Sequence, residues 1–341
     1  MTVFRKIHHH LLVVNLFIES LPMLKTFLKN TALFLLLICS FSSLAEETLS
    51  PKQLLQEMKK ASDQLNYEFS FIQTTPSNMD SLRYRHFKAD GKTYAQLVTL
   101  DGAQQEIVQR DNLISYFQAN YQPFTINGEG IIDNLPPLLQ SNFNALEKYY
   151  DFVYIGRNRV ADRVVQTIRI LPKDDFRYQY LAFIDEENHL LLRSDMLDSD
   201  GNLLDQFRVV NLYIGDGLSG LVEYLNHVTV PPLLLDKKAN KTPSFNWQPG
   251  WLPKGFKLVN RSIETDSGEK IESQLYSDGL FSFTLYVSAK IADTDKQDNT
   301  WRQGAYTIYS ESVDNKEVTI IGQVPISTAK RIVQDIKLRK Q

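Results

Sequence analysis

The residues that most often carry catalysis or metal binding are few in this sequence, and they are not spaced for either task. Past residue 45 the histidines are His86, His189 and His227, and none has a second ligand residue at a metal-binding spacing such as H-E-x-x-H. The stretch "GDGLSG" (215–220) lacks the nucleophile motif G-x-S-x-G, so Ser219 fits the start of a helix better. We therefore expect no enzyme, no bound metal and no other cofactor.

The acidic stretches also have ordinary structural interpretations. "DSDGN" (198–202) resembles a calcium loop only faintly, because its glycine is fourth rather than sixth, and a β-turn is the simpler interpretation. The sequence contains neither a phosphate-binding loop nor a dinucleotide fingerprint. A formal net charge of −3 gives no footprint for nucleic acid.

Aromatic residues on predicted strands are more informative. Two interpretations remain open for them: an ordinary core, or the lining of an incompletely closed barrel that holds an acyl chain. These candidates for a lipid pocket are Tyr67, Phe69, Phe71, Tyr84, Phe117, Tyr180 and Phe207.

The elements that must position these residues can be read from the local pattern. Ser50, Pro51 and Gln53 form a capping box that predicts a helix over 50–65. Alternating apolar segments separated by turn residues then predict roughly ten antiparallel strands. Further helices are expected over 135–150 and 216–226. Together these elements favour one large antiparallel sheet wrapped around helices.

A second pattern lies near the C-terminus. "YSDGLFSF" (276–283) joins two alternating segments, and its Ser-Asp-Gly turn predicts a β-hairpin. Phe281, Phe283, Leu285 and Val287 are expected to face the core under a final helix over 327–338.

The chain of 341 residues is long enough for two domains, and its ends differ in composition. Residues 1–45 contain a basic segment, a short apolar run and Ser43-Leu44-Ala45, which predict a secretory signal peptide that starts at Met1 or at Met23. Acylation at Cys39, the only cysteine, is the alternative. We then expect a large domain over 46–230, a proline- and lysine-rich linker over 231–246 and a small domain over 247–341.

"WLPKGF" (251–256), "LYSDGLFSFTLYV" (275–287) and "VTIIGQVPISTAKRIVQDI" (318–336) together resemble the RseB/MucB family of periplasmic sigma-E regulatory proteins. "SPKQLLQEMKKAS", "YEFSFIQT" and "LRYRHF" are similar to the same family's large domain. The resemblance implies an α+β fold, with an open, LolA-like antiparallel half-barrel around helices and a smaller C-terminal α+β domain. It also implies a negative regulator of the envelope stress response that binds the periplasmic segment of the anti-sigma factor RseA and protects it from site-1 proteolysis. Lipid or lipopolysaccharide would be the releasing signal.

Exposed aromatic residues are typical anchors of protein interfaces, which suggests where such a partner would bind. The candidate partner-binding residues are Tyr276, Ser277, Asp278, Leu280, Tyr286, Trp247 and Trp251. In the alternative interpretation, Tyr276 and the two tryptophans only seal the join between the domains. A periplasmic lipid or lipoprotein carrier of the LolA/LolB type is the alternative function, and an unrecognised hydrolase is a third.

Overall fold

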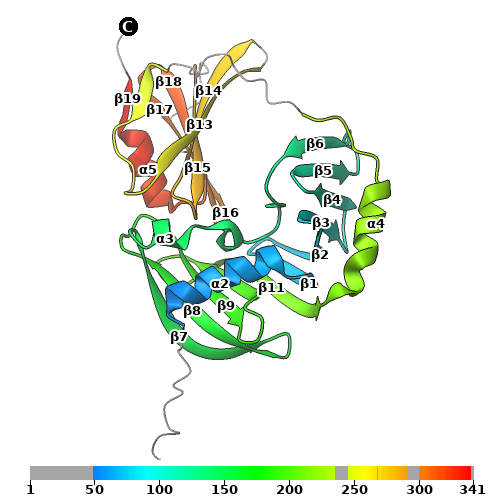
Figure 1. The fold of residues 1–341 in the computed structure, drawn as a ribbon. Coiled ribbons are helices and arrows are strands. Elements are labelled where there is room, and N and C mark those ends of the chain that lie inside the picture. Colours follow the sequence, from blue (N-terminus) through cyan, green and yellow to red (C-terminus); the bar gives the residue numbers. More distant parts are fainter. Residues whose placement is uncertain (1–48, 235–244, 267, 290–298, 339–341) are drawn as a thin grey trace, which may run out of the picture. The chain divides into compact units, whose positions relative to one another are not determined.

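The computed structural model describes residues 49–234, 245–266, 268–289 and 299–338 (Figure 1). The predicted signal peptide, with Met23 and Cys39, and residues 235–244 of the predicted linker lie outside the described residues. Within the described ranges, no helix is long and apolar enough to cross a membrane.

Eleven antiparallel strands form the large sheet (Figure 1). Their order is β6-β5-β4-β3-β2-β1-β11-β10-β9-β8-β7, so β11 returns to pair with β1 while β6 and β7 form the two edges. The sheet is therefore open rather than a closed barrel. The strands are β1 (Tyr67–Thr75), β2 (Asn78–Ala89), β3 (Lys92–Thr99), β4 (Gln105–Arg110), β5 (Leu113–Gln118), β6 (Phe124–Asn127), β7 (Tyr150–Val160), β8 (Arg163–Pro172), β9 (Gln179–Asp185), β10 (Leu191–Leu197) and β11 (Leu203–Ile214).

Two helices pack on opposite faces of this sheet. Helix α2 (Pro51–Gln64) begins as predicted, because the Ser50 hydroxyl accepts from the Gln53 amide while the Gln53 side chain accepts from the Ser50 amide. Its buried Leu54, Leu55 and Met58 join the main core. On the other face, α4 (Ser219–His227) follows the short 3-10 helix η2 (Asp216–Leu218) and packs against β2, β3 and β4. Figure 1 shows α2 inside the curve of the sheet and α4 outside it.

The segment between β6 and β7 is not the single helix predicted over 135–150. It contains only a 3-10 turn, η1 (Pro137–Gln140), and one turn of α-helix, α3 (Phe143–Leu146). Ser141 has extended backbone angles, and the Asn142 side chain caps α3 by accepting from the Ala145 amide. The prolines and this internal cap interrupt the helix, and β7 already begins at Tyr150.

The C-terminal part has its own sheet of six strands in the order β13-β14-β15-β18-β17-β16. The strands are β13 (Lys257–Asp266), β14 (Glu269–Ser277), β15 (Ser282–Ala289), β16 (Asn299–Gln303), β17 (Tyr306–Val313) and β18 (Lys316–Gly322). Helix α5 (Ile326–Gln334) lies against one face of this sheet (Figure 1). The predicted helix over 327–338 is too long, because Ile336–Leu338 forms β19 and pairs with β12 (Trp247–Pro249).

The predicted α+β class is confirmed, with a large open antiparallel sheet and a smaller C-terminal sheet. The expected hairpin is present as β14–β15. Phe281, Phe283, Leu285 and Val287 are buried with α5 as expected. The same hydrophobic cluster includes Tyr180 of β9, whose ring stacks on Phe281 with 5.5 Å between centroids. The two sheets therefore share a continuous core.

Candidate functional site

The tip of the β14–β15 hairpin is held in shape by its own side chains. Asp278 Oδ1 accepts from the backbone amides of Leu280 at 2.9 Å and Phe281 at 2.8 Å. Ser277 Oγ accepts from the amide of Gly279 at 3.0 Å and donates to the carbonyl of Phe281 at 2.9 Å. Gly279 has φ +94°, a conformation that favours glycine. The tip is therefore a preformed turn.

This tip meets the large sheet domain through a buried ion pair. Arg177, which precedes β9, donates from Nη1 to Asp278 Oδ2 at 2.8 Å, and both side chains are completely buried. The Tyr150 hydroxyl donates to the same oxygen at 2.6 Å. Burial, and then the charge of Asp278, raises the pKa of Tyr150 well above its usual value. Asp278 is thus a buried anion whose two oxygens each accept two hydrogen bonds.

Arg177 is surrounded by groups from both parts of the chain. Its Nη2 donates to Asp174 Oδ2 and to the carbonyl of Lys254, each at 2.6 Å. The guanidinium carbon also lies 5.3 Å from the ring centroid of Tyr150 and 5.4 Å from that of Phe256. Nothing in the local sequence marks Arg177, because its partner Asp278 is 101 residues away.

The structure contradicts the expected exposure of three candidate partner-binding residues. Tyr276, Leu280 and Trp247 are buried. Tyr276 lies opposite Phe283 in the β14–β15 register, so its ring shares the core face of the sheet. Trp247 stacks on Phe245, and its Nε1 donates to Glu272 at 2.7 Å. These three residues are not exposed anchors, because the core of the C-terminal part covers them.

The remaining candidates are placed differently. Trp251 is half-buried at the join, where its ring meets Phe176 edge-to-face with 4.8 Å between centroids. The alternative in which aromatic residues seal the join therefore fits Trp251. Asp278 is buried, while Ser277 and Tyr286 are half-buried on the hairpin. Partner binding by any of these residues stays a prediction.

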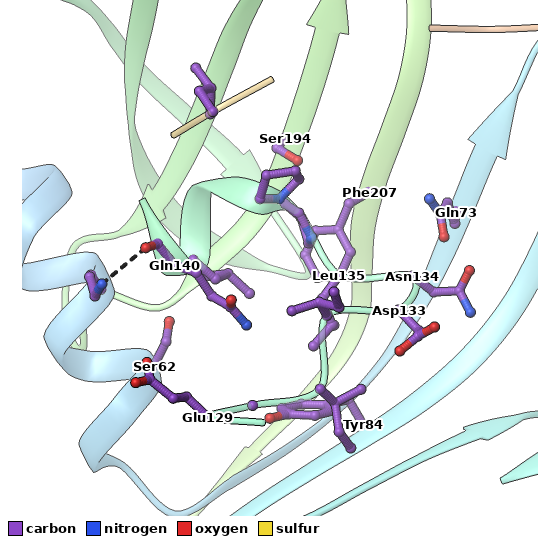
Figure 2. Close-up of a pocket in the computed structure, with 18 of the residues that line it drawn as sticks. Ser62, Gln73, Tyr84, Glu129, Asp133, Asn134, Leu135, Gln140, Ser194 and Phe207 are labelled. Carbon is purple, nitrogen blue, oxygen red and sulfur yellow. Dashed lines mark hydrogen bonds between the residues drawn. The ribbon is translucent and has the colours of Figure 1, made fainter. Parts of the chain in front are cut away.

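A cavity of about 1140 Å³ adjoins the hairpin tip. Its walls are α2, the concave face of the large sheet, the segment 129–140 and the C-terminal residues Ser277, Gly279, Leu280 and Tyr306. Figure 2 shows Ser62 on α2 and Glu129, Asp133, Asn134 and Leu135 on the connecting segment, with Tyr84 and Phe207 on the sheet. The Lys59 ammonium donates to the carbonyl of Gln140 at 3.1 Å and so ties α2 to this segment.

Four of the seven candidate lipid-pocket residues line this cavity: Tyr67, Tyr84, Tyr180 and Phe207. Phe69 and Phe71 do not, because they are buried in the packed cluster of the same sheet face. Phe117 lies with the cluster under α4 on the other face. The expectation of a pocket lined by all seven is therefore wrong for these three residues.

The cavity has a mixed rather than an apolar lining. Its carboxylates are Asp63, Glu129, Asp133 and Asp205, and its amines are Lys59 and Lys88. Burial raises the pKa of both Asp63 and Asp205. Burial lowers the pKa of His86 to about 4, and its Nδ1 donates to the carbonyl of Leu65 at 2.8 Å. An acyl chain gains little against such walls, because buried polar groups need hydrogen-bond partners.

The C-terminal sheet has an exposed apolar surface that was not predicted from the sequence. We call it the Trp301 face and define it by Trp301, Tyr306, Ile308 and Ile321. Trp301 lies opposite Ile308, and Ile308 opposite Ile321, so these side chains share one face. Trp301 is 51% exposed and Tyr306 53%. Alternation in "AYTIYSES" predicts one exposed row but not which row the core covers.

The Trp301 face and the cavity are adjacent, because Tyr306 belongs to both. Within the described ranges no group of three or more histidine, cysteine, aspartate or glutamate residues could hold a metal ion. The site therefore combines an aromatic surface with an acidic cavity, a combination that suits the binding of a polypeptide segment.

Comparison with known proteins defines the class of protein. The chain belongs to the MucB/RseB family: the family model for the MucB/RseB N-terminal domain matches residues 50–234, and that for the C-terminal domain matches residues 241–337. This family consists of regulatory binding proteins rather than enzymes.

Individual relatives are similar over nearly their whole length. The chain is 61% identical to the sigma-E factor regulatory protein RseB of Haemophilus influenzae, covering 92% of this chain and 98% of the relative. It is 43% identical to RseB of Escherichia coli K12, covering 87% and 93%. A crystal structure of MucB in complex with MucA(peri) superposes with a TM-score of 0.67 at 23% identity, covering 86% of this chain and 100% of that one. At that identity the likeness shows the fold alone.

Proposed function

We propose that this protein is a periplasmic regulator of the sigma-E response that binds the periplasmic segment of the anti-sigma factor RseA and slows its cleavage by the site-1 protease. The observation that carries the proposal is the 61% identity to a sigma-E factor regulatory protein, RseB, over 98% of that relative. The crystal structure of MucB in complex with MucA(peri) supports a second protein as the partner of this chain.

The Trp301 face and the adjoining cavity are the proposed binding surface. Large aromatic side chains supply contact area at low entropic cost, and Trp and Tyr are enriched among the residues that dominate binding energy. The four carboxylates of the cavity outnumber its two lysines, so a partner segment with a lysine or arginine near the cavity has complementary charge. The mixed lining gives less support to the carrier function and to a lipid signal.

Substitution at the exposed tryptophan tests this surface. Trp301→Ala should weaken binding of the RseA periplasmic segment by at least tenfold, since loss of an interface anchor costs about 2 kcal/mol. The matched control is Tyr121→Ala, because Tyr121 is 71% exposed but lies outside the Trp301 face. Calorimetric titration of the three proteins decides the matter. Equal affinities for wild type and Trp301→Ala would reject this surface, whereas no binding by wild type would reject the function.

The location follows from the same proposal and can be tested separately. Cleavage of the predicted signal peptide after Ala45 gives a periplasmic chain that begins at Glu46 without acylation. Mass spectrometry of the protein isolated from the periplasm measures this directly. An intact N-terminus, or a lipid attached to Cys39, would contradict the prediction.

A further inference from the structure

The Arg177–Asp278 ion pair joins the two parts of the chain at a point that also forms the cavity wall. Asp278 is the second residue of the tip, and its neighbours Ser277 and Gly279 both line the cavity. Arg177 belongs to the large domain and is not one of the residues that line the cavity. A change at Arg177 therefore affects the cavity indirectly, and the hairpin tip is the direct link between the two.

The energetics of a buried pair make this contact sensitive to the loss of one member. Both side chains are fully buried, so each charge offsets much of the other's desolvation, although Asp174 also pairs with Arg177. Removing one partner of such a pair is strongly destabilising, whereas replacing both can be nearly neutral. Surface ion pairs behave differently, because water screens them and their contribution is small.

Arg177 also gathers further groups of the C-terminal part around the same point. Besides Asp278 it contacts the carbonyl of Lys254 and the ring of Phe256. Nearby, the Ser141 hydroxyl donates to the carbonyl of Gly279 at 3.1 Å, and the Tyr178 hydroxyl donates to that of Val324 at 3.0 Å. Of these contacts, only the Arg177–Asp278 ion pair joins two opposite charges whose side chains are both fully buried.

From these contacts we infer that Arg177 and Asp278 are positioning residues: their ion pair holds the hairpin tip against the large domain and so fixes the cavity wall and the orientation of the C-terminal sheet. The pair touches no partner. Its effect on binding is indirect and operates through the placement of Ser277, Gly279 and the Trp301 face. This inference concerns the free protein and does not depend on the proposed partner.

Distance measurements between spin labels test the inference on the full chain. Because Cys39 is the only cysteine, Cys39→Ser gives a chain without cysteine. Spin labels can then be attached to cysteines introduced at Asn158 of β7 and Lys316 of β18, which are both exposed. The wild-type distance distribution should be narrow. In Arg177→Gln it should broaden or shift, because Asp278 loses its cation. The matched control is Arg157→Gln, which removes an exposed ion pair with Glu186 and should leave the distribution unchanged.

A double substitution separates positioning from general damage to the fold. Arg177→Gln/Asp278→Asn leaves a neutral pair that can still form a hydrogen bond, so its distribution should return toward that of wild type. Asp278→Asn alone keeps an oxygen that can accept from the tip amides. It should also broaden the distance distribution, so it provides the test if Arg177→Gln fails to fold. A folded Arg177→Gln or Asp278→Asn with the wild-type distribution would overturn the inference, and so would a double variant as broad as Arg177→Gln.

Discussion

The guanidinium carbon of Arg331 lies 3.8 Å from the ring centroid of Trp251. Arg331 belongs to α5, and Trp251 follows β12. The same guanidinium lies 5.3 Å from the ring of Phe176, which belongs to the large domain and packs edge-on against Trp251. This stack explains why Trp251, a candidate partner-binding residue, is half-buried at the join instead of free on the surface.

Replacing Trp251 should therefore lower stability. Trp251→Ala removes the stack with Arg331 and Phe176, and we expect the free energy of unfolding to fall by about 2 kcal/mol. Trp301→Ala is the matched control and should change it by less than about 0.5 kcal/mol, because Trp301 is exposed. Urea denaturation followed by circular dichroism measures both. Equal losses for the two tryptophans would contradict this assignment.

A second prediction concerns the close approach of Gly255 to Tyr149. Gly255 has φ +97°, and a Cβ at this position would lie 2.7 Å from Tyr149 Cε2. Gly91 also has positive φ, at +74°, but a Cβ there meets open space. Gly91→Ala should cost about 1 kcal/mol through backbone strain alone. Gly255→Ala should cost about 2 kcal/mol more, because the Tyr149 ring must move. Melting temperatures of the two variants compare these costs, and equal shifts would show that the ring yields freely.

The third prediction is a pH dependence of stability that arises from His86. Its pKa is about 4 in the folded protein, against 6.5 when unhindered, because burial disfavours the charged form. The stability that neutral His86 contributes is therefore complete above pH 6.5 and is lost as the pH falls toward 4. The shift corresponds to about 3 kcal/mol.

Comparison with His86→Gln isolates this contribution. The raised pKa values of Asp63 and Asp205 act in the opposite direction, since they favour folding at low pH, but they are common to both proteins. The difference in unfolding free energy between wild type and His86→Gln should shrink as the pH falls from 6.5 to 4. A difference that stays constant from pH 6.5 to 4 would refute the prediction.

Local signals in the sequence predicted local structure well. The capping box at Ser50 and Gln53 determines where α2 begins, because every contact it needs lies within one turn. The alternation around Asp278 and Gly279 likewise predicted the β14–β15 hairpin. In contrast, helix 135–150 was wrong because the extended backbone at Ser141 and the cap at Asn142 interrupt a run whose composition is compatible with a helix.

The candidate site depended on information that a single strand does not contain. Tyr276 was predicted to be exposed because it lies beside the loop, but the strand register sets it opposite Phe283 and hence on the core face. The alternation of residues along β17 does not show that Tyr306 lies on the exposed face of the sheet, because α5 determines which face is covered. The Arg177–Asp278 ion pair could not be predicted from the sequence either, because only the packing of the two parts brings these residues together.

Cleavage of the RseA periplasmic segment by the site-1 protease tests the proposed function most directly. The cleavage rate should fall as purified full chain is added, reach a plateau once the segment is saturated, and fall at higher protein concentrations with Trp301→Ala than with wild type or Tyr121→Ala. A cleavage rate that stays unchanged at saturating concentrations of the wild-type chain would contradict the account.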